Sequence, residues 1–166
     1  PYSQKREDNM AIHKVDGVDG VYNFPKKFVT LRVRAAAGAT ITKGDWMKIY
    51  LTDTEHGLGG TATVASNTAN GEPLVFGVIT ETFDNSAGAA EAFKNIQIQT
   101  AGKFVDAHVD ATMTAGQVLC VSNAGTGAAG RAQVLAASDV VPACGFSLEA
   151  DTAGLADVMI IDQGLF

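Results

Sequence analysis

An internal repeat is the feature of this chain that most restricts how it can fold. Three blocks recur in the same order in its two parts: residues 38–50 on 110–122, 76–81 on 144–149, and 95–104 on 157–166. The first block aligns without gaps, and the offsets of the three blocks are 72, 68 and 62 residues. Shrinking offsets are expected when the second copy has shorter loops. The repeat therefore predicts two related halves within one chain.

The repeated unit is a series of short strands and turns. It opens on a Thr-x-Thr-x-Gly segment, in which Gly44 or Gly116 supplies the positive φ of a turn. Its second strand contains Gly77 or Gly145, as at a bulge or a close approach of two backbones. One half has too few strands to enclose a core, so the two halves are expected to pack together. We predict a mainly β fold: a compact barrel-like or sandwich-like domain of two pseudo-repeated halves.

Apolar runs separated by turn-forming residues predict the individual strands. They lie at residues 29–33, 46–51, 74–79, 96–99, 118–121 and 158–161, and several alternate apolar with polar residues. One segment, residues 86–94, is predicted to be helical, with Ser86 as its N-cap. Residues 1–28 have no apolar periodicity and are predicted to form an extended arm. Residues 29–166 then form a single domain, with halves at about 29–104 and 105–166.

The charge of the chain is distributed unevenly. Nine of its 12 basic residues but only five of its 18 acidic residues lie at or before Lys48. That part carries a net charge of +4 and the remainder −10, for a total of −6. The pI of the whole chain, near 4.9, argues against direct binding of nucleic acid. The basic leader is either an unevenly charged solvated surface or an arm that docks on an acidic partner.

Few residues suggest chemistry, and we expect no enzyme, metal or cofactor. His13, His56 and His108 are far apart in sequence, and none has a neighbour at ligand spacing. The glycines of residues 125–130 have the Gly-x-Gly-x-x-Gly spacing of a nucleotide-binding loop. Such a loop is followed by a helix, whereas a strand-like run follows here, so we interpret the segment as a hairpin loop. Cys120 and Cys144 are not arranged in a Cys-x-x-Cys pair, and we expect buried free thiols.

Membrane insertion and secretion have no support in the sequence. No run approaches 18 apolar residues, so no membrane span is predicted. The first eight residues contain no apolar segment of the kind that secretion signals carry. We therefore expect synthesis in a host cytoplasm.

The order of turns and strands resembles the small head-decoration, or capsid cement, proteins of tailed bacteriophages. The resemblance spans about residues 31–166 and consists of these segments: residues 37–45, Gly77 with the two residues after it, Ile96 and Ile98 before Gly102, residues 111–119, Gly145 with Phe146, and residues 157–161. It implies a β-rich body that assembles as homotrimers at local threefold positions outside an icosahedral capsid. There it would bind the major capsid protein and stabilise the shell.

The arm and the strand that follows it are the expected contact with the capsid. The basic residues assigned to this contact are Lys5, Arg6, Lys14, Lys26, Lys27, Arg32 and Arg34. The alternative is a carbohydrate-binding or receptor-binding β module on a virion or cell surface. Sugar-binding modules present clustered aromatic side chains, whereas this chain has one Trp and three Tyr, two of them in the arm.

Overall fold

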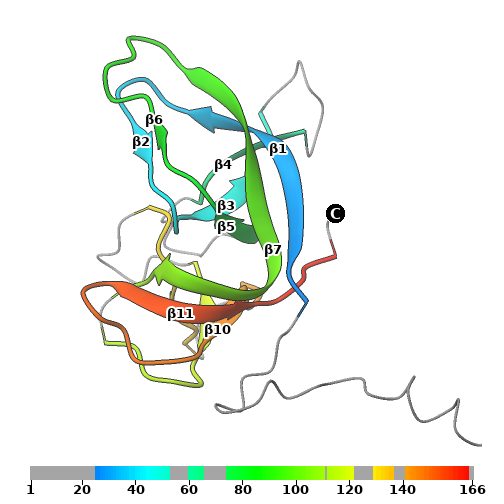
Figure 1. Ribbon diagram of the computed structural model, residues 1–166, viewed down its shortest axis with the longest axis vertical. Helices are drawn as coiled ribbons and strands as arrows, with labels where there is room; N and C mark the ends of the chain where they lie inside the picture. The colour runs from blue at the N-terminus through cyan, green and yellow to red at the C-terminus, as the bar shows by residue number, and fades with distance from the viewer. Residues whose placement is uncertain are drawn as a thin grey trace, which may run out of the picture.

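The structure, a computed structural model, describes residues 25–52, 60–65, 74–110, 112–121, 129–136 and 141–164. Over these residues the chain forms eleven strands and no helix, which confirms the predicted β fold (Figure 1). The strands are β1 (Lys27–Ala35), β2 (Thr40–Ile41), β3 (Trp46–Ile49), β4 (Thr61–Val64), β5 (Val75–Ile79), β6 (Phe83–Asp84), β7 (Ala92–His108), β8 (Val118–Cys120), β9 (Gln133–Val134), β10 (Gly145–Ser147) and β11 (Leu155–Ile160).

Five strands close into a first barrel. The strand order is β1-β4-β3-β5-β7, and β1 also pairs with β7, so each strand has a neighbour on both sides. β1 lies parallel to β4 and antiparallel to the first part of β7. Closure satisfies the backbone groups that an open sheet edge would expose.

The second half of the chain repeats this arrangement. The last residues of β7 pair with β11, and the order continues through β10 and β8 to β9. A single parallel bridge, from Val109 to Ala132, joins the end of β7 to the β9 side of this second barrel. β7 is 17 residues long and belongs to both barrels, as its course along the molecule in Figure 1 shows.

Register and hydrogen bonds confirm the repeat residue by residue. Met47 pairs with Gly77 in the first barrel, and their counterparts Leu119 and Gly145 pair in the second. The turn glycines Gly44 and Gly116 both have positive φ, of 100° and 83°. The N–H of Gly44 donates to Ile79 at 3.1 Å, and that of Gly116 donates to the corresponding Ser147 at 2.8 Å.

The third repeat block is displaced from the sequence alignment by two residues. Val78 pairs with Gln99, and its counterpart Phe146 pairs with Met159, so the structural offset is 60 rather than 62. The alignment followed the glycine and phenylalanine that end both blocks. In the folded chain the inward-facing apolar residues set the register, which places Val158 where Ile98 lies in the first barrel.

The predicted helix over residues 86–94 is wrong. β6 ends at Asp84, a turn follows, and β7 begins at Ala92, opposite Ala35 of β1. The Asn85 side chain holds this turn, because its Nδ2 donates to the carbonyl oxygens of Ala36 and Ala90 at 2.8 and 3.0 Å. Pairing with β1 outweighs the helical propensity of the alanines.

Two predicted boundaries also change. Residues 1–24 of the expected arm lie outside the described residues, and β1 already begins at Lys27, which pairs with Ala101. The boundary expected between residues 104 and 105 falls inside β7. The two halves therefore share a strand and are not joined by a linker.

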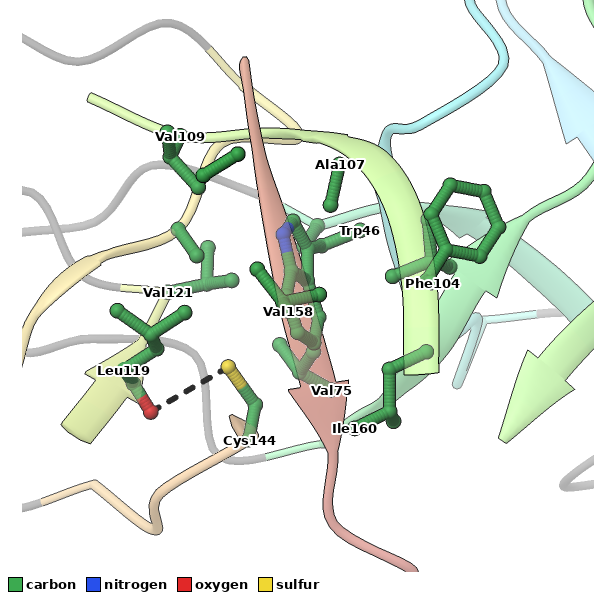
Figure 2. Packing of buried hydrophobic residues seen from close by; sticks show 14 of the residues in the cluster. Trp46, Val75, Phe104, Ala107, Val109, Leu119, Val121, Cys144, Val158 and Ile160 are labelled. Carbon is green, nitrogen blue, oxygen red and sulfur yellow. Dashed lines mark hydrogen bonds between the residues drawn. The ribbon is translucent and has the colours of Figure 1, made fainter. Parts of the chain in front are cut away.

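Trp46 connects the cores of the two barrels. It lies on β3 next to Met47, which faces the first core, and its own indole packs into the second core with Val158 and Cys144 (Figure 2). The indole is fully buried, and its Nε1 donates to the carbonyl oxygen of His108 at 3.1 Å. Cys144 and Cys120 are buried free cysteines, as predicted, and burial raises the pKa of the Cys144 thiol well above its ordinary value.

Candidate functional site

The basic residues of β1 lie on the outside of the first barrel. Alternate residues of a strand face opposite sides, and Val33 and Ala35 are buried in the barrel interior. The opposite alternation places Phe28, Arg32 and Arg34 on the outer side. This face of β1 is the part of the expected contact surface that the structure describes; Lys5, Arg6 and Lys14 lie outside the described residues.

Two of these basic residues are held in ion pairs within the chain. Lys27 Nζ lies 2.5 Å from Asp162 Oδ2, and Arg34 donates through Nη2 to Glu91. The Arg34 guanidinium also stacks 4.5 Å above the Tyr50 ring. The hydrogen bond to Glu91 raises the pKa of Arg34, and the same bond lowers the pKa of Glu91. Lys27 and Arg34 are therefore each already paired with a carboxylate of the same chain.

Arg32 has a different environment on the same strand. Its guanidinium lies 3.9 Å from the centroid of the Phe93 ring, which is 40% exposed. A cation above an aromatic face is stabilised by the ring quadrupole. Arg32 and Phe93 form a composite cationic and aromatic surface.

Lys26 faces a hollow that also contains a lysine not assigned to the contact from sequence. The hollow has a volume of about 300 Å³, and the residues that define it here are Lys26, Phe28, Lys43 and Val105; we call it the lysine hollow. Phe28 and Val105 are 46% and 51% exposed. Among the described residues, neither Lys26 nor Lys43 takes part in an ion pair. Two cations that no described residue pairs with thus flank exposed apolar surface.

The position of Lys43 could not be deduced from its neighbours in sequence. It lies in the turn between β2 and β3, and its backbone N–H donates to Thr82 Oγ1 at 3.0 Å. Closure of the barrel brings this turn near the start of β1. The sequence indicates this surface only through the excess of basic residues up to Lys48. That excess does not distinguish residues that form ion pairs within the chain from those that do not.

A buried histidine–carboxylate pair lies where the two barrels meet. His108 Nδ1 is 2.6 Å from Asp45 Oδ1, and both side chains are mostly buried. Burial raises the pKa of the Asp45 carboxyl, although the N–H of Thr42 and His108 oppose that change. In the second barrel Gln117 replaces Asp45 and accepts the equivalent bond from Thr114. The pair therefore caps a turn that the repeat also builds without charge.

The structure gives little support for other chemistry in the segments it describes. Within them, no cluster of three or more His, Cys, Asp or Glu side chains is arranged to hold a metal ion. Only Ala129 and Gly130 of the glycine-rich loop at residues 125–130 are described, so the hairpin expected there stays a prediction. His13 and His56 also lie outside the described residues.

Glu91→Gln is expected to destabilise the protein at pH 7 but not at strongly acidic pH. Arg34 lowers the pKa of the Glu91 carboxyl below its ordinary value of 4.5. Such a group contributes stability above its unfolded pKa and loses it as the pH falls through the lowered folded pKa. Urea unfolding of both proteins at pH 7 and near pH 2.5 measures the difference. An equal difference at both pH values would show that the ion pair does not stabilise the fold.

Comparisons with known proteins leave the chain without an identified relative. No protein-family model, curated protein or solved structure matches it. The described part of the chain contains no helix long and apolar enough to cross a membrane.

Proposed function

We propose that this protein is a structural virion protein that decorates the outer surface of an icosahedral phage capsid. The observation that carries the proposal is the lysine hollow on a closed, well-packed barrel. Lys26 and Lys43, two cations without ion-pair partners among the described residues, flank the exposed side chains of Phe28 and Val105. The arrangement suits a protein surface that offers carboxylates beside apolar groups. The resemblance of the repeated turns and strands to cement proteins supports the same function.

The chemistry of such a contact follows from its two components. Burial of the exposed Phe28 and Val105 side chains against a partner would stabilise the complex, because apolar surface is removed from water. Lys26 and Lys43 attract an acidic partner, which accelerates encounter and selects against basic surfaces. Assembly of three copies would multiply a weak contact, since simultaneous engagement raises the effective affinity by roughly 10²- to 10⁴-fold. The partner implied is the major capsid protein, with homotrimers at local threefold positions.

Reversing both lysines of the hollow is expected to weaken capsid binding. The test is co-pelleting of the purified protein with undecorated capsids of the phage that carries its gene. Saturable binding with a plateau in multiples of three per local site is the expected result for the parent protein. The Lys26→Glu/Lys43→Glu variant should lose affinity by about tenfold or more, because the contact then repels an acidic surface.

A second double variant controls for net charge. Lys94→Glu/Lys103→Glu makes the same change at two lysines that are paired with Glu81 and Asp157. We expect its binding to stay much closer to that of the parent protein. Equal losses in the two variants would reject the lysine hollow as the contact. Absence of binding by the parent would reject decoration, and saturable hits on a glycan array would then favour the carbohydrate-binding alternative.

A further inference from the structure

A second hollow lies on the first barrel, apart from the lysine hollow. It has a volume of about 420 Å³, which is within the range of small-molecule sites. Its wall includes Arg34 and Tyr50, and its apolar lining includes Ile41, Ile49 and Val64. We call it the arginine hollow. The ends of β1 and β3 meet β2 and β4 there, so rigid strands position most of its side chains.

One donor in this hollow has no acceptor. Among the described residues, Arg34 Nε is the buried side-chain nitrogen or oxygen that forms no hydrogen bond. The guanidinium donates through Nη2 to Glu91 and stacks on Tyr50, but these contacts leave the Nε–H unsatisfied. A buried donor without a partner destabilises the folded state, because it has lost its hydrogen bonds to water and gained none in return. An acceptor supplied by a ligand would provide one.

The second barrel shows that the repeated unit does not need a cation here. Val33 pairs with Ala62, and the equivalent Val109 bridges Ala132. The next residue is Arg34 in the first barrel but Asp110 in the second. The same strand position therefore accepts either sign of charge, and the arginine is a property of this hollow rather than of the fold.

We propose that the arginine hollow binds a small aliphatic carboxylate. The carboxylate would accept from the Nε and Nη2 donors of Arg34, whose planar fork matches its two oxygens. The hydrocarbon part would contact Ile41, Ile49 and Val64. Glu91 competes with the ligand for the same guanidinium donors. Its side chain is 47% exposed against 19% for Arg34, so a ligand would displace Glu91 into solvent while Arg34 stays in place.

Hexanoate is a suitable probe, with hexan-1-ol and hexylammonium as neutral and cationic analogues of the same length. Each is titrated into the full chain, and binding is followed through backbone amide shifts in ¹⁵N–¹H spectra. We expect saturable shifts around Arg34 and Tyr50 with hexanoate and markedly weaker ones with the analogues. Equal binding by hexan-1-ol, or no saturable binding by hexanoate, would overturn the proposal.

Variants at the ion pair give opposite expected changes. Arg34→Gln should weaken hexanoate binding about tenfold or more, and Arg34→Lys should also weaken it because the fork is lost. Glu91→Gln should strengthen binding several-fold by removing the competitor. Glu81→Gln, which breaks the exposed pair with Lys94, is the matched control and should leave binding unchanged. If the Glu91→Gln variant binds hexanoate no more tightly than the control, Glu91 does not compete with the ligand for Arg34. These outcomes do not depend on whether the protein decorates capsids.

Discussion

The Trp46→Ala variant is expected to lose about 3–5 kcal/mol in its free energy of unfolding, the usual cost of truncating a buried tryptophan. Trp46 is fully buried, and its indole occupies the second core although its strand belongs to the first barrel. Truncation would leave a cavity against Gly145 and remove one of two hydrogen bonds that the His108 carbonyl accepts, the other coming from the N–H of Ala132. Because small domains are stable by only about 5–15 kcal/mol, this single change removes a large part of the total.

The repeat supplies a matched control for Trp46. Val118 occupies the equivalent position of the second barrel, where it is 44% exposed. Val118→Ala should change stability by no more than about 0.5 kcal/mol, as surface substitutions usually do. Urea denaturation followed by far-ultraviolet circular dichroism compares the two variants. Similar midpoints for them would show that Trp46 does not join the barrels energetically.

The Gly77→Ala variant is expected to be destabilised by about 2 kcal/mol or more, as overpacking of a well-packed core is. An ideal Cβ on Gly77 would lie 2.4 Å from the carbonyl oxygen of Gln99, so a backbone must move. Gly145→Ala should behave alike, because its Cβ would lie 2.6 Å from the equivalent carbonyl of Met159. In each barrel, strands approach too closely for any side chain at this point.

Gly116→Ala separates crowding from backbone strain. Gly116 has a φ of 83°, but a Cβ there would meet nothing within 4 Å. Its substitution should cost about 1 kcal/mol, from the unfavourable conformation alone. Thermal melts and urea unfolding of the three variants give the comparison. A Gly77→Ala protein as stable as Gly116→Ala would contradict the close approach of the strands.

Local patterns in the sequence predicted the repeated unit well. The turns at Gly44 and Gly116 and the close approach at Gly77 follow from residue types and spacing, because only glycine suits them. Apolar runs between turn-forming residues predicted the positions of β1, β3, β5, β8 and β11 and part of β7. The short strands β2, β6 and β9 have two residues each and are defined by their pairing partners, so no local pattern could reveal them.

Features that depend on pairing across the chain were not predictable. Residues 86–94 are rich in alanine, yet the registry of β7 with β1 decides their conformation. Charge counts placed Lys27 and Arg34 with the other basic residues, but Asp162 and Glu91 are 135 and 57 residues away from them. The same folding gives Lys26 and Lys43 no such partner among the residues that the structure describes. The number of basic residues in the leader can be counted from the sequence. Which of them can pair with another protein depends on the tertiary structure.

The 17-residue strand β7 has a mechanical consequence. One continuous backbone is hydrogen-bonded to β1 along its first part and to β11 along its last, so within the described residues no separate linker joins the barrels. We therefore expect the described parts of the two barrels to tumble as one body, which nuclear relaxation of the backbone amides would report as a single correlation time.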